Sequence, residues 1–285
     1  MPETLRYLGL ELSGAKNQKT ALAVIEYYPK ERKTFLLDVF DKIAPHSDQT
    51  SDQALIELIR EETGNDKPKK MGVNVPLTLP PCLSCSPRSC SPSTSLAGNC
   101  GSPSVRWMNQ YIRKVSHAKN LKNKINPFTP YTQRPFELWA RYELLNRLPK
   151  NHFFEIDEAL GGNRAPLTAR MHFLKKQLRH FPLCEVWPKL TVAFLSQKLA
   201  LSPRVIRSYR LLEQGAHFRE LILNAIAKQY EVFIYERDLR KLAQSLTGFD
   251  AFLCAFTVVL SDRGECAKVP KGFPEKSGWV CYPEA

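Results

Sequence analysis

The stretch from Arg6 to Tyr28, RYLGLELSGAKNQKTALAVIEYY, decides how the rest of the chain is interpreted. Leu8, Leu10 and Leu12 alternate with Tyr, Gly and Glu, which is the two-residue period of a β-strand. The segment Ser-Gly-Ala-Lys-Asn interrupts the pattern, and residues 20–28 resume it as a second strand. The opening of the chain therefore predicts two sequential strands.

Glu11 is the exception in the first strand, because leucines flank it on both sides. A carboxylate in an apolar strand is costly to bury unless it is paired with a cation or bound to a metal ion. Its partner is therefore either a basic side chain or a metal ion that other acids share.

The charge balance favours a polyanionic partner. The 285 residues include 41 Lys and Arg against 28 Asp and Glu, which gives a formal net charge of +13. Such an excess is typical of nucleic-acid-binding proteins, although a basic soluble protein without such a partner shows it too.

The N-terminus has no apolar signal segment, and the longest apolar run, Ala251 to Leu260, is too short to cross a bilayer. We expect a cytoplasmic protein without membrane contact. Its eight cysteines should then be reduced thiols or metal ligands rather than disulfides. Nothing in the sequence indicates a protein partner.

The next segments predict a mixed sheet. A third strand over Lys33–Ile43 precedes a helix over Ser47–Thr63, which Ser51 or Asp48 caps and Gly64 ends, and then a strand over Met71–Leu79. The crossover helix makes the first and fourth strands parallel. Because Gly72-Val73-Asn74 repeats the pattern of Gly9-Leu10-Glu11, Glu11 and Asn74 should meet near one edge of the sheet.

Residues 80–103 are rich in Pro, Ser, Gly and Cys, which is the composition of a loop. The loop holds four cysteines in the spacing C-x2-C-x4-C-x9-C, namely Cys82, Cys85, Cys90 and Cys100. Thiolates on one Zn²⁺ ion or one iron–sulfur cluster would order this segment. The spacing matches no single site type well, so zinc, iron–sulfur and free thiols all stay open.

Residues 104–150 form a basic centre in which cations for phosphates alternate with aromatic side chains on which bases stack. The candidate nucleic-acid-binding cations are Arg113, Lys114, Lys119, Lys122 and Lys124. The aromatic residues are Trp107, Tyr111, Phe128 and Tyr131. The alternative is a solvated helix face whose aromatic residues belong to the core.

Two further acids stand among apolar residues. Glu185 lies in a short strand, Leu183–Trp187, which Pro188 turns into a helix. Asp250 precedes the apolar helix Ala251–Leu260, where the helix dipole by itself would favour an acid in the first turn. A last short strand is expected over Tyr230–Ile234.

Four segments, taken in order, resemble the signature of a known family. They are Gly9-Leu10-Glu11-Leu12-Ser13, Gly72-Val73-Asn74-Val75-Pro76-Leu77, Glu185-Val186-Trp187-Pro188 and Asp250-Ala251-Phe252-Leu253-Cys254-Ala255-Phe256. They resemble the predicted ribonuclease H-like nucleases of domain-of-unknown-function family 429. The resemblance spans nearly the whole chain. It implies one α/β domain over residues 1–285, with a ribonuclease H-like mixed sheet, flanking helices, and a Cys-rich loop plus basic helical insertion over residues 80–150.

The resemblance also implies a divalent-metal site built from Glu11, Asn74, Glu185 and Asp250. Two Mg²⁺ or Mn²⁺ ions roughly 4 Å apart promote phosphodiester hydrolysis, and such hard ions prefer carboxylate oxygens. Glu11 and Asn74 both stand where the family usually has Asp. Glu11 can still ligate, whereas Asn74 removes a negative charge and so weakens metal binding.

We therefore expect a metal-dependent nuclease, a hydrolase that acts on DNA or RNA and is weakened by Asn74. The alternative is a non-catalytic nucleic-acid-binding protein on the same fold. A phosphotransfer enzyme ranks third, because the chain has no Gly-rich loop to hold phosphates.

Overall fold

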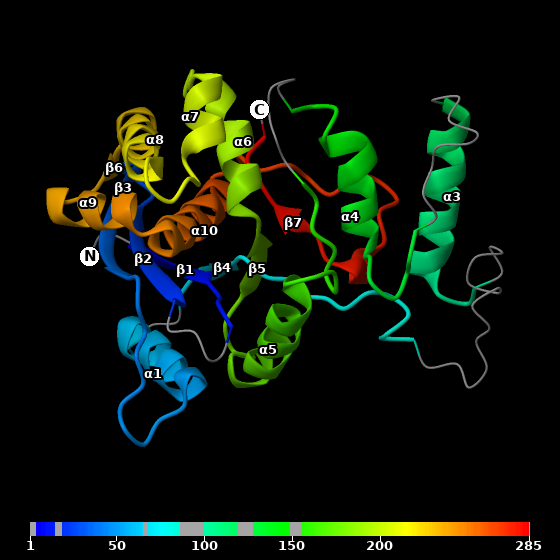
Figure 1. The fold of residues 1–285 in the computed structure, drawn as a ribbon, viewed down its shortest axis with the longest axis horizontal. Helices are drawn as coiled ribbons and strands as arrows, with labels where there is room; N and C mark the ends of the chain where they lie inside the picture. Colours follow the sequence, from blue (N-terminus) through cyan, green and yellow to red (C-terminus); the bar gives the residue numbers. More distant parts are fainter. Residues whose placement is uncertain are drawn as a thin grey trace.

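The computed structural model describes residues 4–14, 19–64, 68–85, 100–118, 128–148 and 155–284. Seven strands form one mixed sheet in the order β6-β3-β2-β1-β4-β5-β7 (Figure 1). Strands β1 to β3 pair antiparallel, whereas β1, β4, β5 and β7 run parallel to one another. Their bounds are β1 Leu5–Glu11, β2 Ala21–Tyr28, β3 Lys33–Phe40, β4 Lys70–Val73, β5 Leu183–Val186, β6 Val232–Phe233 and β7 Val280–Cys281. The predicted α/β mixed sheet with parallel first and fourth strands is confirmed.

Helices cover both faces of the sheet (Figure 1). On one face lie α6 Pro188–Lys198, α7 Pro203–Ser208, α8 Gly215–Tyr230, α9 Glu236–Gln244 and α10 Leu246–Asp262. The other face carries α1 Ser51–Thr63 and α5 Arg164–Gln177. Beyond the β7 end of the sheet lie α3 Pro103–Ala118 and α4 Pro135–Trp139, which continues as a π-helical turn over Ala140–Leu144. A 3₁₀ turn spans Glu275–Ser277.

The two faces bury separate apolar cores. On the α10 face, the sheet contributes Tyr7, Ala23 and Val186 to a core that includes most of α10. On the α1 and α5 face, it contributes Leu10 and Val73. None of the described helices is by itself long and apolar enough to cross a membrane, and α9 with α10 passes that test only as a pair bent by 115°.

Several predicted boundaries were wrong. The first crossover helix begins at Ser51 and is capped by Thr50, whose side chain forms a capping box with Gln53, so neither predicted cap holds. The strand predicted over Met71–Leu79 is shorter in the structure, because β4 ends at Val73, before the prolines that follow. Helix α10 begins at Leu246 with Ser245 as its N-cap, which places Asp250 beyond the first turn. The two-residue strand β7 was missed, because so short a run carries no period.

Helix α10 lies directly on the backbone of β1 and β4. Gly9 and Gly72 are paired in register on these strands. A Cβ atom at Gly9 would lie 2.0 Å from the carbonyl oxygen of Ala251, and one at Gly72 would lie 2.3 Å from that of Cys254. Because neither glycine has a side chain, the helix backbone packs directly on these two strands. Any side chain at either position would displace the helix.

We expect Gly9→Ala to destabilise the protein by about 3 kcal/mol or more, because the added methyl group meets helix backbone rather than a movable side chain. Gly101→Ala is the matched control, since a Cβ atom there has nothing within 4 Å. Urea denaturation of both variants measures the difference. Equal stability of Gly9→Ala and wild type would contradict the close approach of α10.

Candidate functional site

Glu11 and Asn74 meet at the carboxyl ends of β1 and β4, as their matching sequence patterns predicted. Leu10 is in register with Val73, so the next residue on each strand lies beside the other. The Asn74 Nδ2 atom donates a hydrogen bond of 2.6 Å to Glu11 Oε2, and Arg164 Nη2 donates one of 3.1 Å to Asn74 Oδ1. Asn74 therefore links the Glu11 carboxyl group to a cation on α5.

Asp250 approaches the same point from α10. It is 1% exposed, and the Nη1 atom of Arg210 donates to both of its carboxylate oxygens, at 3.0 and 2.9 Å. Arg210 follows α7 and is about one-third exposed, so it bridges the buried acid and the surface.

Burial and a like charge shift the acids of this site. Burial, followed by the neighbouring Asp250 carboxylate, raises the pKa of Glu11 to about 8, although the Asn74 hydrogen bond opposes the shift. Burial also raises the pKa of Asp250, against the lowering effect of Arg210. Glu11 is therefore largely protonated at neutral pH in the metal-free protein.

A pocket of about 180 Å³ opens beside these residues. It lies between α5 and the first turn of α6, and its lining includes Glu11, Asn74, Glu155, Asp157, Arg164, Leu167, Trp187, Pro188, Lys189 and Arg210. The pocket therefore combines acids, cations and one aromatic ring at the carboxyl edge of the sheet, which is where open α/β sheets bind ligands.

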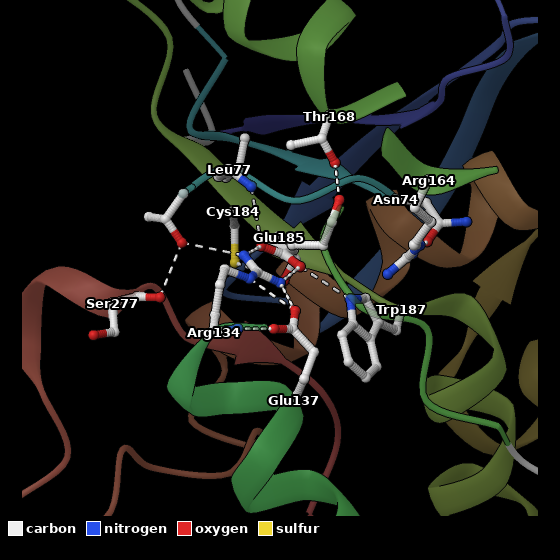
Figure 2. Close-up of polar contacts among 12 residues, drawn as sticks. Asn74, Leu77, Arg134, Glu137, Arg164, Thr168, Cys184, Glu185, Trp187 and Ser277 are labelled. Atoms are coloured by element: carbon white, nitrogen blue, oxygen red, sulfur yellow. Dashed lines mark hydrogen bonds and ion pairs between the residues drawn. The ribbon is translucent and has the colours of Figure 1, made fainter. Parts of the chain in front are cut away.

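Glu185, the remaining acid predicted for this site, belongs to a different cluster. Arg134, the N-cap residue of α4, donates two hydrogen bonds of 2.7 Å to the two Glu185 oxygens (Figure 2). Leu77 N–H and Trp187 Nε1 also donate to Glu185, each at 3.0 Å. Every oxygen of this carboxylate thus has at least two donors.

Strand geometry separates Glu185 from Glu11. Glu185 is in register with Val73, which packs on the α1 and α5 face of the sheet. Because side chains alternate along a strand, Glu11 leaves its strand on the opposite face, with Gly9 and α10. The structure thus brings Glu11, Asn74 and Asp250 together, and it holds Glu185 in the Arg134 cluster.

The Arg134 cluster contains a third charged residue, Glu137, which bonds the same guanidinium at 2.6 Å. Both Arg134 and Glu137 are fully buried. Burial raises the pKa of Glu137 in spite of Arg134. Burial would raise that of Glu185 as well, but the guanidinium and the other donors outweigh it and lower its pKa. Arg134 therefore favours the ionised form of Glu185 more strongly than that of Glu137.

The basic centre is described only in part. Arg113 and Lys114 are exposed on α3, whereas Lys119, Lys122 and Lys124 lie outside the described residues. Of the four aromatic residues, Tyr131 is 57% exposed and Phe128 is buried. Trp107 stacks on Tyr111 at 4.9 Å between ring centroids and packs against Phe273. Phe128 is thus part of an apolar cluster, and Trp107 and Tyr111 pack against its edge, while nucleic-acid binding by the basic centre stays a prediction.

The cysteine loop is also described in part. Cys100 is buried with Val105 and Met108, and Cys82 packs against the same cluster. Cys85 lines a neighbouring pocket, and Cys90 lies outside the described residues. Within the described part of the chain, no group of three or more His, Cys, Asp and Glu side chains is arranged to hold a metal ion. Zinc or an iron–sulfur cluster at this loop stays a prediction.

The arginines were missed by the sequence reasoning. Arg134, Arg164 and Arg210 each contact one of the predicted site residues, yet each comes from a loop or helix terminus far from its partner in the sequence. The only signal in the sequence was the free-energy cost of burying an acid, which predicts a neighbouring cation but does not identify it.

No family model, curated protein or solved structure matches this chain. The fold and site alone define its class, an α/β protein with a seven-stranded mixed sheet and a charged pocket at the carboxyl edge of its parallel strands.

Glu185→Gln should destabilise the protein by about 3 kcal/mol, because it leaves the buried Arg134 guanidinium with one carboxylate partner, Glu137, in place of two. The matched control is Glu26→Gln, which breaks the partly exposed pair with Arg6 and should change stability by about 1 kcal/mol or less. Urea denaturation at pH 7 compares the two. If Glu185→Gln were as stable as the Glu26→Gln control, the structural role of Glu185 would be contradicted.

The raised pKa of Glu11 predicts a stability that falls with pH. Between the ordinary value of 4.5 and about 8, the folded protein holds a proton that the unfolded chain has released. The stabilisation from this group is complete below pH 4.5 and is lost as pH rises towards 8. Glu11→Gln, which has no proton to lose, should therefore gain stability relative to wild type between pH 5 and 8.

Urea denaturation at both pH values in EDTA measures this gain. Glu220→Gln, on the exposed side of α8, is the control and should follow wild type. Parallel pH dependences of Glu11→Gln and wild type would mean that Glu11 is ionised throughout this range.

Proposed function

We propose that this chain is a divalent-metal-dependent nuclease with a ribonuclease H-like fold, and that its metal site consists of Glu11, Asn74 and Asp250. The observation that carries the proposal is the meeting of these three residues from β1, β4 and α10. The strand order β3-β2-β1-β4-β5, with β2 antiparallel, supports the ribonuclease H-like assignment that the sequence resemblance implied.

The donor set suits a hard divalent cation. Glu11 is half-buried and Asp250 is buried, and the two carboxylates repel each other once Glu11 is ionised, so a cation between them would relieve the repulsion. With the Asn74 amide oxygen, which accepts from Arg164 in this structure, they offer oxygen ligands from three side chains, and such a set suits one Mg²⁺ or Mn²⁺ ion completed by water. Since Glu185 lies in the Arg134 cluster, the proposed site holds one ion rather than two.

A bound ion of this kind would activate a water molecule and stabilise charge on the phosphodiester. The protein's own residues prepare the site. Arg164 holds Asn74 in place, and Arg210 neutralises Asp250 until a cation replaces it. Glu11 must lose its proton before it can act as a ligand, so metal binding should strengthen as pH rises towards 8.

Asn74→Asp tests the site directly, because it restores the acid that the family resemblance expects. The added charge beside Glu11 should lower the melting temperature in EDTA and enlarge the stabilisation by Mn²⁺. Cleavage should rise about tenfold, which corresponds to about 1.4 kcal/mol. The assay is Mn²⁺-dependent cleavage of single- and double-stranded DNA, RNA and a DNA–RNA hybrid, with melting curves in parallel.

Loss of function provides the second half of the test. Asp250→Asn and Glu11→Gln should abolish cleavage, while Glu220→Gln should retain it. Cleavage by Asp250→Asn at the wild-type rate would contradict the proposed metal site. The absence of Mn²⁺-dependent cleavage by both wild type and Asn74→Asp would contradict the proposed nuclease function.

The second candidate is a non-catalytic nucleic-acid-binding protein on the same fold. One specific observation favours it, since Asn74 and Arg210 already satisfy Glu11 and Asp250 without a metal ion. Salt-sensitive binding of the nucleic-acid panel without cleavage would establish this function instead.

A further inference from the structure

Three cysteines that the proposed metal site does not use meet on the α10 face of the sheet. In β7, Cys281 is in register with Val186 of β5, so its side chain leaves the sheet on the same face as that of Cys184. The chain after α10 brings in Cys266, which pairs with Pro283 in an isolated antiparallel bridge. All three cysteines contact the apolar core on this face, and we call them the thiol cluster.

Cys281 lies at the centre of the thiol cluster. The thiols of Cys184 and Cys266 both form hydrogen bonds with its sulfur atom. The hydroxyl group of Ser261, at the end of α10, does so as well. The ammonium group of Lys70, which donates to Ser261 at 3.3 Å, adds a positive charge nearby. One sulfur atom thus has three donors and a cation around it.

These contacts favour the ionised form of Cys281 over that of its neighbours. Hydrogen bonds from Cys184 and Cys266 lower the pKa of the Cys281 thiol below its ordinary value, and they outweigh the opposing effect of burial. The same bonds raise the pKa of both neighbours. Lys70 supports the thiolate, although Asp262 shares its charge at 2.5 Å. Because the thiolate is the nucleophile, Cys281 is the reactive thiol of the three.

The thiol cluster lies just below the surface. Cys281 is 6% exposed, while Cys184, Cys266 and Lys70 around it are half-buried, so a molecule as small as hydrogen peroxide can reach it. Cys254, in the middle of α10, is the contrasting case. It is fully buried, and burial raises the pKa of its thiol, which makes it inert.

Cys266 is better placed than Cys184 to form a disulfide with Cys281. Bonded sulfur atoms are about 2.05 Å apart, closer than hydrogen-bonded thiols, so one partner has to move. Cys184 is fixed in β5, which pairs with β4 on one side and with β7 on the other. Cys266 lies outside the strands, shortly after the turn at Gly264. A shift of Cys266 therefore disturbs one isolated bridge rather than the central sheet.

We propose that Cys281 is a site of reversible oxidation by hydroperoxides, and that its disulfide partner is Cys266. The Cys281 thiolate attacks one oxygen of hydrogen peroxide and breaks the O–O bond, which gives a sulfenic acid and hydroxide. The Cys266 thiol gives its proton to that hydroxide. Its sulfur then displaces the sulfenic oxygen as a second hydroxide, which takes a proton from solvent. Two cysteines are oxidised to one disulfide, one peroxide is reduced to two water molecules, and a dithiol reverses the reaction by exchange.

This inference goes beyond the proposed function and does not depend on it. Asp250 lies near the start of α10, whereas Ser261 lies near its end. The disulfide would join the chain after α10 to β7 and close the loop between them. Because such a closed loop restricts the unfolded chain, oxidation should raise the melting temperature.

The test uses the full chain, which is reduced with dithiothreitol, desalted and treated with limiting hydrogen peroxide. Free thiols are then blocked with N-ethylmaleimide in urea, and a peptide map by mass spectrometry assigns each of the eight cysteines. Wild type should form the disulfide between Cys266 and Cys281 at least about tenfold faster than peroxide modifies Cys254. Dithiothreitol should restore both thiols.

Cys266→Ser removes the second thiol, so Cys281 should stay a sulfenic acid that dimedone labels. Cys85→Ser, in the segment before α3, is the control and should form the disulfide at the wild-type rate. Circular dichroism establishes that both variants are folded, and the wild-type map is decisive without them. A Cys281 that stays reduced while other cysteines are oxidised would overturn the inference, and so would a disulfide between Cys281 and any cysteine other than Cys266.

Discussion

The close packing of the α10 backbone on Gly9 and Gly72 is the constraint on which the rest of the structure depends. Only hydrogen atoms on both strands allow the helix backbone to approach the sheet so closely. That approach buries nearly every residue from Phe249 to Leu260 and brings Asp250 to the carboxyl edge of β1. The same two glycines thus set the thickness of the larger core and the position of one acid of the candidate site.

Buried charge is handled in two ways in this protein. Glu185 is fully compensated by Arg134 and its other donors, and its lowered pKa reflects that. Glu11 has an amide donor but no bidentate cation, and its pKa is raised. A compensated acid stabilises a fold, whereas an uncompensated one is poised to bind a proton or a metal ion. Asp250 lies between these two cases, because Arg210 pairs with it while burial still raises its pKa.

The sequence predicted the first three strands, the crossover helix and the contact of Glu11 with Asn74, because period, crossover rules and a repeated Gly-x-polar pattern are all local or nearly local. It did not predict the face on which Glu185 lies. That face depends on the register between β4 and β5, which lie far apart in the sequence, and a shift of one residue would reverse it. The pairing arginines depend in the same way on contacts that no local pattern encodes.

Arg134 lies in the segment 80–150, which the family resemblance predicts to be an insertion, yet its partner Glu185 lies in the central sheet. The segment that carries Arg134 is therefore tied to the sheet by a buried ion pair. A shortened homologue that lacks the arginine would retain an acid in its sheet without a counter-ion, and one that lacks the acid would bury a lone guanidinium. The two residues should therefore be gained or lost together during divergence, which makes their joint presence a criterion for sorting true relatives of this chain from proteins that share only its sheet.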